Sequence, residues 1–273
     1  MDAGEPMTTP AIELEGLSKA FGTKPVLDGI DLVVAPGQVF GYVGPNGAGK
    51  STTVKILVGM LTGFEGRATV AGFDVKRRPL EVKRRIGFLP ENAKLFDALT
   101  VREHLLLVGR LQGLDDARIL GRAKVLLEGF ELDTRIGSRL DALSKGMRQK
   151  VMIVGSLLHD PELLFLDEPL SGLDVHSTVL LKELIQALAA AGKTIFYCSH
   201  MMDVVERVCD RIAVLADGKI VAEGSFEELA AARGEGETLE RIFLELTAGG
   251  GEAERARHML SAFRDGGAVE IGE

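Results

Sequence analysis

A glycine-rich segment at residues 44–52 carries the clearest chemistry in this sequence. It reads GPNGAGKST and fills the pattern G-x-x-x-x-G-K-[ST], directly after the apolar run 39–43 and before the helical pattern 53–57. A buried strand that turns through glycines into a helix N-terminus points several backbone N–H groups at one concavity, where a polyphosphate can bind. We expect Lys50 to reach the β- and γ-phosphates and the Ser51 hydroxyl to ligate Mg²⁺. The predicted phosphate-contacting residues are Gly44, Asn46, Gly47, Gly49, Lys50, Ser51 and Thr52.

A second motif places two carboxylates at the end of an apolar run. Residues 163–168 read LLFLDE, which is typical of a buried strand that emerges at the carboxyl edge of a parallel sheet. Open α/β sheets bind ligands at that edge, so both acids are expected beside the phosphate loop. There Asp167 would hold Mg²⁺ and Glu168 would polarise an attacking water. A solvated acidic strand end is the simpler alternative, but together with GPNGAGKST the motif favours nucleotide hydrolysis.

The elements that must position these residues follow a strand and helix pattern. Buried strands are predicted at 163–166 and 194–198, with a helix at 177–190 between them. Further strands are predicted at 12–21, 26–34, 67–71, 86–89, 211–215 and 219–222. The last two flank Asp217-Gly218, which is a two-residue hairpin signal.

From Thr100 onward the pattern becomes helical. Thr100 and Glu103 form a capping box, and helices are predicted at 116–127 and 144–158. Ser225 and Glu228 form a second capping box, and a last helix is predicted at 239–246. We therefore predict an α/β fold: a P-loop NTPase core with a mixed sheet, an N-terminal antiparallel β part and an α-helical subdomain inserted at about residues 90–160.

Composition and charge exclude several classes of protein. The net charge of −8 argues against a general nucleic-acid-binding surface, and no nucleic acid partner is expected. Cys198 and Cys209 lack metal-site spacing and are expected to be buried, reduced thiols. We find neither a secretory signal nor a membrane-spanning apolar run. A basic cluster predicts a solvated helix face, and a contact to lipid headgroups or nucleic acid is the alternative. The cluster consists of Arg77, Arg78, Lys83, Arg84 and Arg85.

The segment Leu143-Ser144-Lys145-Gly146-Met147 indicates which class of nucleotide-hydrolysing protein this sequence resembles. Together with the two motifs above, it resembles the ATP-binding-cassette (ABC) ATPases, whose L-S-G-G-Q signature opens a helix and binds the γ-phosphate of ATP held by the other protomer. Ser144 and Gly146 keep the hydroxyl and the backbone N–H that this role requires. Lys145 and Met147 depart from the general pattern.

Other motifs occur in the order of that family. Asp174 resembles the D-loop aspartate, and His200 resembles the switch histidine that contacts the γ-phosphate. Phe21 stands where the family places an aromatic ring against adenine. The resemblance covers residues 11–246, which we predict to form one ABC ATPase domain with ATP and Mg²⁺ as cofactors.

At one position with a chemical role in the family, this chain has a different residue. The loop after strand 86–89 usually carries Gln, which meets Mg²⁺ and the lytic water, whereas Glu91 stands there in this chain. A carboxylate is a harder, charged ligand, so Glu91 could keep both the metal and catalytic roles with altered affinity. A slowed or inactive enzyme is the alternative. Retention is favoured because Glu91 together with S-K-G-M resembles the ABC-2 export group, whose cassettes are separate polypeptides.

The resemblance implies an ATP-hydrolysing subunit that dimerises around ATP and drives export through an integral membrane permease. Its partners would be a homodimer mate or a second cassette, and the permease; its location would be cytoplasmic, peripheral on the inner face of the cell membrane. A soluble ABC ATPase of DNA repair or translation is the alternative, but those relatives carry paired cassettes, coiled-coil arms or zinc-binding insertions. The sequence does not name the cargo.

Residues 247–273 are predicted to be a flexible tail with a short helix. The tail begins with a run of glycines. It then carries a helical apolar stripe formed by Ala253, Ala256, Met259, Leu260 and Phe263. The stripe is interpreted as a docking face, and a frayed terminus is the alternative.

Overall fold

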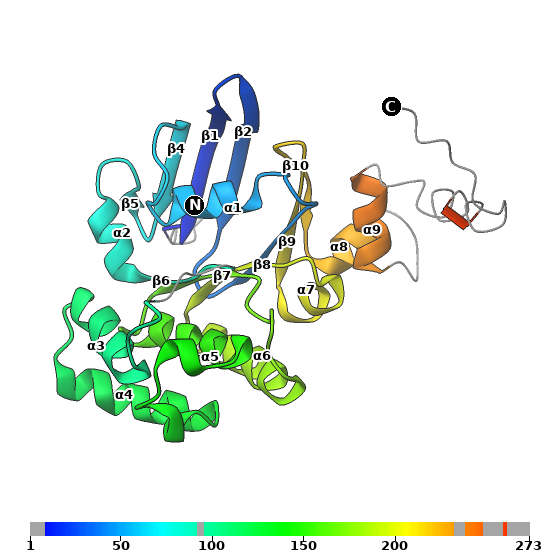
Figure 1. The fold of residues 1–273 in the computed structure, drawn as a ribbon. Coiled ribbons are helices and arrows are strands. Elements are labelled where there is room, and N and C mark those ends of the chain that lie inside the picture. The colour runs from blue at the N-terminus through cyan, green and yellow to red at the C-terminus, as the bar shows by residue number, and fades with distance from the viewer. Residues whose placement is uncertain (1–8, 92–95, 232–237, 248–258, 261–273) are drawn as a thin grey trace, which may run out of the picture.

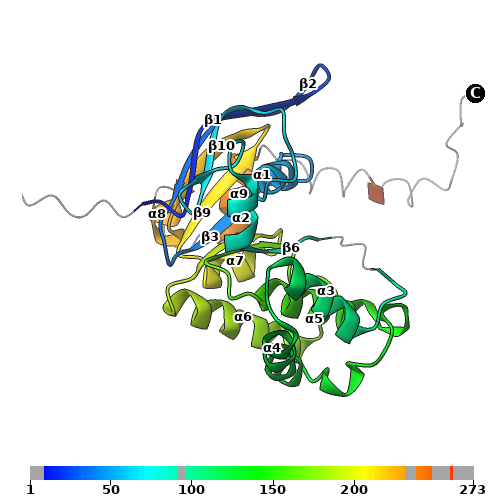
Figure 2. The same cartoon turned by 90° about the vertical axis from the view of Figure 1, so that its left-hand side faces the viewer.

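Two β-sheets and the helices around them make up the described part of the chain (Figures 1 and 2). The structure is a computed structural model and describes residues 9–91, 96–231, 238–247 and 259–260. The smaller sheet is antiparallel, in the order β2-β1-β4-β5. Its strands are β1 (Ile12–Phe21), β2 (Lys24–Val34), β4 (Glu65–Val70) and β5 (Phe73–Asp74).

The larger sheet is mixed and has the order β10-β9-β3-β8-β7-β6. Its pairs are parallel except for β10, which pairs antiparallel with β9 through the predicted hairpin. The strands are β3 (Val39–Val43), β6 (Ile86–Leu89), β7 (Leu163–Asp167), β8 (Thr194–Cys198), β9 (Arg211–Ala216) and β10 (Lys219–Gly224). Since β3 lies between β8 and β9, segments distant in sequence meet at the carboxyl edge of this sheet.

The helices fall into groups around the larger sheet. The helical insertion, which lies between β6 and β7 in sequence, consists of α3 (Val101–Leu111), α4 (Asp116–Gly129) and α5 (Lys145–Leu157), which pack against one another. Short 3-10 turns at Asp133–Arg135 and Leu140–Ala142 connect α4 to α5. The other helices are α1 (Lys50–Leu57), α2 (Pro79–Arg85), α6 (Val175–Ala190), α7 (Met202–Val208), α8 (Phe226–Ala231) and α9 (Leu239–Leu246).

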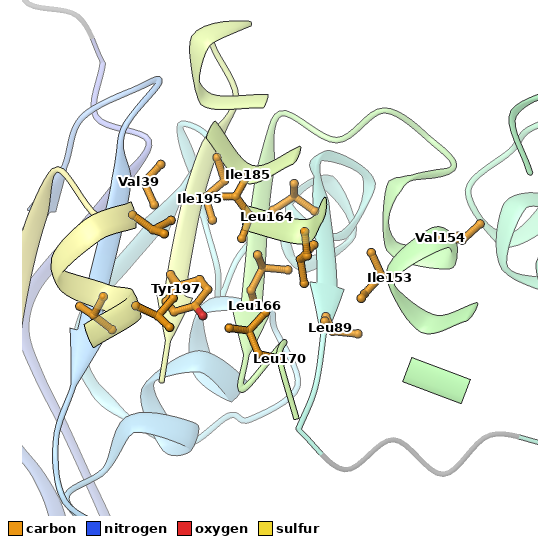
Figure 3. Close-up of a cluster of buried hydrophobic side chains, with 14 of the residues drawn as sticks. Val39, Leu89, Ile153, Val154, Leu164, Leu166, Leu170, Ile185, Ile195 and Tyr197 are labelled. Atoms are coloured by element: carbon orange, nitrogen blue, oxygen red, sulfur yellow. The ribbon is translucent and has the colours of Figure 1, made fainter. Parts of the chain in front are cut away.

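The central strands of the larger sheet, β3, β7 and β8, are buried on both faces, which explains why they are almost entirely apolar. On β7, Leu164 and Leu166 join a core shared with the insertion, while Leu163 and Phe165 join the core beneath the antiparallel sheet. Figure 3 shows Leu164 and Leu166 within the first of these cores. Successive side chains of a strand point to opposite faces, so a strand between two cores has no polar face.

Local turn and cap signals are formed as predicted. Thr100 Oγ1 accepts a hydrogen bond from Glu103 N at 3.2 Å, and the Glu103 carboxylate accepts one from Thr100 N at 2.8 Å. Ser225 and Glu228 form the same reciprocal pair. Asp217 and Gly218 both adopt positive φ, as a two-residue hairpin turn requires. These features confirm an α/β fold with a mixed sheet, an antiparallel N-terminal part and helices between β6 and β7.

The predicted element bounds differ from the structure by a few residues, and some elements were not predicted. α1 begins three residues before the apolar pattern does, at Lys50, because the phosphate loop itself starts the helix. β5 and α7 were missed because both are short, and a short apolar run does not distinguish helix from strand.

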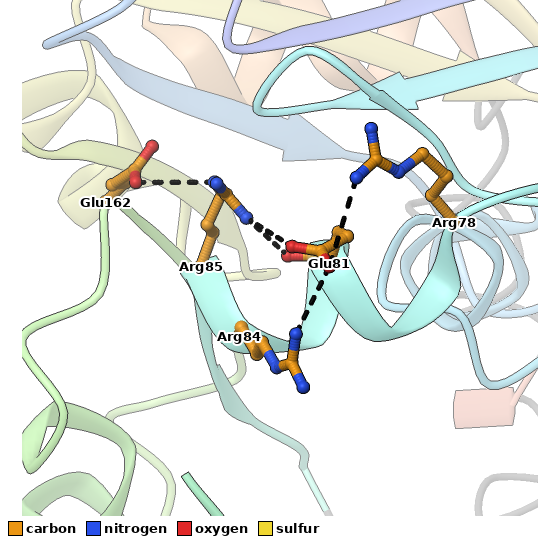
Figure 4. Close-up of polar contacts among 5 residues, drawn as sticks. All are labelled: Arg78, Glu81, Arg84, Arg85 and Glu162. Carbon is orange, nitrogen blue, oxygen red and sulfur yellow. Dashed lines mark hydrogen bonds and ion pairs between the residues drawn. The ribbon is translucent and has the colours of Figure 1, made fainter. Parts of the chain in front are cut away.

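The basic cluster lies on and beside α2, as predicted for a solvated helix face. Glu81 forms ion pairs with Arg78, Arg84 and Arg85, and Arg85 also approaches Glu162 at 3.6 Å (Figure 4). The three arginines lower the pKa of the Glu81 carboxyl, chiefly through the hydrogen bond from Arg85. The cluster is therefore partly neutralised within the chain.

The predicted C-terminal tail falls largely outside the described residues. Ala253, Ala256 and Phe263 are not described, so the apolar stripe remains a prediction. Met259 and Leu260 are described, are helical and are exposed.

Candidate nucleotide site

A cavity of about 1300 Å³ lies over the carboxyl ends of β3, β6, β7 and β8. Most of the predicted site residues line it: Phe21, Gly44, Asn46, Gly47, Gly49, Lys50, Ser51, Thr52, Glu91, Asp167, Glu168 and His200. They come from five separate segments of the chain, which the strand order of the larger sheet brings together. The cavity is therefore the structural counterpart of the predicted nucleotide site.

The phosphate loop forms the floor of this cavity and needs its glycines for steric reasons. Gly47 and Gly49 have φ of 84° and 115°, which L residues with a side chain rarely adopt. A Cβ at Gly44 would lie 2.5 Å from the Leu215 carbonyl oxygen. The ammonium of Lys50 donates to the carbonyl oxygens of Gly44 at 2.5 Å and Pro45 at 3.1 Å.

The start of α1 is suited to an anion. No side chain caps this helix, and its first turn contains no acidic residue. The first backbone N–H groups of a helix have no partner within the helix and lie at the positive end of its dipole. A phosphate group in the cavity would therefore meet free donors, the Lys50 ammonium and the Ser51 and Thr52 hydroxyls.

Carboxylates gather opposite this positive end. Asp167 is buried, and burial raises its pKa to about 6, with further upward contributions from Glu91 and Glu168 and a smaller opposing effect of Lys50. Burying a carboxylate beside two others disfavours its charged form, and a nearby cation would restore that form.

The donor set fits the predicted Mg²⁺. In the described part of the chain, no three His, Cys, Asp or Glu side chains are grouped closely enough to hold a metal by themselves. Mg²⁺ is usually held by one or two carboxylates together with substrate phosphates and water, so a complete protein cage is not required. Ser51, Asp167 and Glu91, which all line the cavity, are the residues that would hold it.

Glu168 is positioned by two neighbours on the loop after β8. Its Oε1 lies 2.7 Å from His200 Nδ1, and its Oε2 accepts a hydrogen bond from Ser199 Oγ at 3.2 Å. Ser199 is buried and also accepts a hydrogen bond from Met201 N, so its hydroxyl is fixed on both sides. Glu168 has φ of 50°, an uncommon conformation for a residue with a side chain, and such strain is often found at functional sites.

Ser199 has a contact that the sequence analysis did not assign to it. Only His200 was singled out in the segment 198–200, because the resemblance concerns that residue alone. A serine next to a candidate histidine at a strand end is a weak signal without the contact to Glu168.

The cavity has further walls beyond the phosphate loop and the carboxylates, one of them predicted and one not. Phe21, at the end of β1, is 51% exposed, and the Lys19 ammonium lies 5.1 Å from its ring centre. Glu240, Phe243 and Leu244 of α9 line the cavity as well. The sequence predicts only a helix at 239–246, and nothing in the local pattern of this segment points to the phosphate loop.

Ser144, Gly146 and Asp174 do not line this cavity. Ser144 caps α5 through a hydrogen bond from Met147 N at 3.2 Å. An added Cβ at Gly146 would collide with the carbonyl oxygen of Gly172. Asp174 caps α6, accepts hydrogen bonds from Ser177 N and Oγ, and pairs with Lys150 at 3.1 Å. The hydrogen bonds from Ser177, followed by that from Lys150, lower the pKa of the Asp174 carboxyl.

These residues form a second group, in which the start of α5 packs on the segment between β7 and α6. Besides the contact of Gly146 with Gly172, Lys145 Nζ donates to Ser171 Oγ at 3.2 Å. Gln149 Nε2 donates to the carbonyl oxygen of Pro169 at 3.0 Å. The predicted signature and D-loop are thus held together, apart from the nucleotide cavity of the same chain.

Comparison with known proteins shows which family this chain is similar to. Residues 27–171 match the family model described as ABC transporter. The Nod factor export ATP-binding protein I of Rhizobium sp. (strain N33) is 42% identical over 219 residues, which cover 80% of this chain and 72% of that protein. The daunorubicin/doxorubicin resistance ATP-binding protein DrrA of Streptomyces peucetius is 41% identical over 226 residues, covering 83% of this chain and 68% of that protein.

The fold also matches that of a solved relative. A structure described as the ATP binding subunit of an ABC transporter superposes with a TM-score of 0.82 at 34% identity, covering 86% of this chain and 99% of the other. The chain therefore belongs to the ABC transporter family and is an ATPase of the ATP-binding-cassette type.

Proposed function

We propose that the cavity binds Mg-ATP and that Glu168 is the base that polarises the attacking water. The observation that carries this proposal is the arrangement of Glu168, Ser199 and His200 at one edge of a cavity whose floor is the phosphate loop. A carboxylate held from two sides cannot rotate freely, so it can keep one oxygen directed at a water molecule.

The other residues of the cavity supply charge and orientation. Lys50 and the start of α1 stabilise the negative charge that develops on the phosphates during hydrolysis. Mg²⁺, when bound, would neutralise charge on the β- and γ-phosphate oxygens. His200, whose side chain is 74% exposed, reaches toward the cavity while its Nδ1 contacts Glu168, so its other ring nitrogen is free to meet the γ-phosphate.

We further propose that two cassettes close head to tail, so that Ser144 and Gly146 of one meet the nucleotide held by the other. The start of α5 is exposed at Ser144 and has no acidic residue in its first turn, which suits an anion. Its distance from the cavity of its own chain is expected under this arrangement. If the purified chain alone forms a dimer in solution with Mg-ATP, the second cassette can be an identical chain.

The transport role is proposed as export through a separate membrane permease. Two relatives at about 40% identity are named for export and for drug resistance. Within the described residues, no helix has the length and apolar character needed to cross a bilayer. A soluble ABC ATPase of DNA repair or translation is not favoured by these relatives.

The helical insertion provides a suitable contact for that permease. An apolar groove of about 350 Å³ runs between the insertion and the core, and Phe88, Val108 and Met152 are among its lining residues. Met60 at its edge is 63% exposed. Because the groove borders both β6 and α3, a permease segment bound there would respond to movement of the insertion relative to the cavity.

The proposed base is tested by the Glu168→Gln variant. We expect ATP binding to persist and turnover to fall by about 10²- to 10⁴-fold, the usual contribution of a general base. The variant should then accumulate as an ATP-dependent dimer in gel filtration with Mg-ATP, while the parent should not. Turnover close to that of the parent would show that Glu168 is not the base.

The predicted metal contact of Glu91 has a separate test. Glu91→Gln keeps the reach of the side chain and removes its charge, so the Mg²⁺ dependence of ATP hydrolysis should shift while activity remains. A Mg²⁺ titration that superimposes on that of the parent would exclude the contact.

A further inference from the structure

The C-terminal helix α9 forms part of the wall of the nucleotide cavity. Glu240, Phe243 and Leu244 line the cavity together with the phosphate loop and Phe21. Residues three and four apart share one face of a helix, so these three side chains form a single surface of α9. The opposite side of the helix carries Leu239 and Ile242, which are fully buried in the core.

The position of α9 is fixed by contacts to the segment that follows His200. Leu239 N donates a hydrogen bond to Glu206 Oε2 at 3.2 Å, and Glu206 belongs to α7. α7 packs against α9 and begins two residues after His200. Thr238 caps the helix through a hydrogen bond from Arg241 N at 3.4 Å. The cavity-facing surface of α9 is therefore held in place by the core rather than by a ligand.

The chemistry of this surface excludes the phosphates as its target. Phe243 and Leu244 are apolar, Glu240 is acidic, and none of them attracts an anion. The phosphate loop and Lys50, which line another part of the cavity, are the groups proposed to bind the triphosphate. What remains of a nucleotide is the base and the ribose, which offer a flat apolar surface, hydroxyl groups and amino groups.

We propose that α9 contacts the nucleoside end of the bound nucleotide: Phe243 and Leu244 pack on the base or ribose, and the Glu240 carboxylate accepts a hydrogen bond from a hydroxyl or amino group there. This inference rests on the proposed placement of ATP in the cavity. It adds a second element to the single aromatic residue, Phe21, that the sequence assigned to the base. The nucleoside would then be bound jointly by the first strand and by the last helix of the described core.

The test compares ATP with inorganic tripolyphosphate, which lacks the base and ribose, in isothermal titration calorimetry with Mg²⁺. Phe243→Ala and Leu244→Ala should each raise the Kd for ATP about two- to tenfold, the size of one aromatic or apolar contact. The Kd for tripolyphosphate should not change. Val179→Ala, an exposed apolar residue on α6 that does not line the cavity, is the matched control and should leave both unchanged.

Several outcomes would overturn the inference. An unchanged Kd for ATP in the folded variants excludes the contact, and an equal loss of ATP and tripolyphosphate binding excludes a contact to the nucleoside. Phe243 also packs on the core, so its truncation can unfold the protein. In that case the titration of Leu244→Ala, which changes a residue that is 40% exposed, is the test of the inference. Lys50→Ala should weaken both ligands, and if it weakens neither, the proposed nucleotide cavity itself is wrong and this inference falls with it.

Discussion

The nucleotide edge, which is the carboxyl edge of the larger sheet together with its cavity, differs from the helical insertion in how its polar groups are satisfied. In the insertion, each helix is preceded by a capping residue whose side chain accepts a hydrogen bond from a backbone N–H group of the first turn. These residues are Thr100 for α3, Asp115 for α4 and Ser144 for α5. At the nucleotide edge, α1 begins at Gly49 without a side-chain cap, and burial together with two nearby carboxylates, Glu91 and Glu168, raises the pKa of Asp167.

This difference shows where the chain relies on a ligand. In a capped helix, a side chain of the same chain accepts a hydrogen bond from the first N–H groups, and this cap contributes to stability. An uncapped helix start and a group of like charges lower the stability of the free protein and are satisfied only when phosphate and a cation arrive. Substitutions at the nucleotide edge should therefore change binding and turnover, and substitutions in the insertion should change unfolding.

Lys50→Ala should give the largest effect and should separate the two regions most clearly. Loss of the ammonium is expected to weaken ATP binding about a thousandfold, roughly 4 kcal/mol, while the free energy of unfolding changes little. Calorimetry and urea denaturation measure the two quantities. Lys55→Ala, an exposed lysine on the same helix that does not line the cavity, should bind ATP like the parent.

Leu105→Ala should show the opposite behaviour. Leu105 is fully buried in the core of the insertion, so its truncation should lower the free energy of unfolding by about 3 kcal/mol. ATP affinity of the folded fraction should be unchanged. Leu111→Ala removes the same side chain from an exposed position of α3 and should have little effect in urea denaturation. Equal losses in the two variants would contradict the assigned core.

Asp167→Asn tests whether the nucleotide edge is destabilised for function. The substitution removes a buried charge beside Glu91 and Glu168, so the unfolding free energy of the nucleotide-free protein should rise by about 1 kcal/mol while ATP hydrolysis is lost. Asp160→Asn is the control. The Asp160 carboxylate pairs with Lys193 at 2.7 Å, so its removal should not raise the free energy of unfolding. A lower thermal midpoint for Asp167→Asn would show that the carboxylate is structurally required.

Thr100→Ala measures how much the insertion gains from its caps. Removing the hydroxyl breaks the hydrogen bond from Glu103 N, and we expect a loss of about 1 kcal/mol in urea denaturation. Thr100→Ser keeps the hydroxyl and should restore most of the stability. If both variants unfold like the parent, the capping box contributes nothing to this helix.

The smallest effect concerns a buried residue of the insertion that is not satisfied. His104 is buried, its Nδ1 has no hydrogen-bond partner, and burial lowers its pKa below the usual 6.5. The unfolded chain therefore gains this proton more readily than the folded chain as the pH falls below about 6.5, so stability decreases toward acidic pH.

His104→Phe should make the stability curve flatter between about pH 7 and pH 5, by roughly 1 kcal/mol or less. The slope should not vanish, because burial also lowers the pKa of His159. His176→Phe changes an exposed histidine on α6 and serves as the control in urea denaturation at each pH. A parallel curve for His104→Phe would exclude the proposed contribution.

Local signals in the sequence were sufficient to predict the parts of the molecule that depend on neighbouring residues. The phosphate loop, both capping boxes and the Asp217-Gly218 hairpin each lie within a few residues, and backbone sterics and short-range hydrogen bonds determine them. The resemblance then placed Glu168 and His200 in one site, although they lie in separate motifs. The predicted Mg²⁺ contacts, the dimer and the tail remain predictions.

Only the tertiary structure decided which of the distant residues meet. Glu168 contacts Ser199 and His200 because β7 and β8 are neighbours in the sheet, and that strand order cannot be read from the spacing of the motifs. Asp174 pairs with Lys150 outside the nucleotide cavity because the start of α5 packs on the segment between β7 and α6, and α9 reaches the cavity because it packs on α7. The sequence by itself determined the elements and the chemistry they carry, since both depend on local interactions, whereas the side-by-side order of strands and helices depends on which long-range packing buries the most apolar surface.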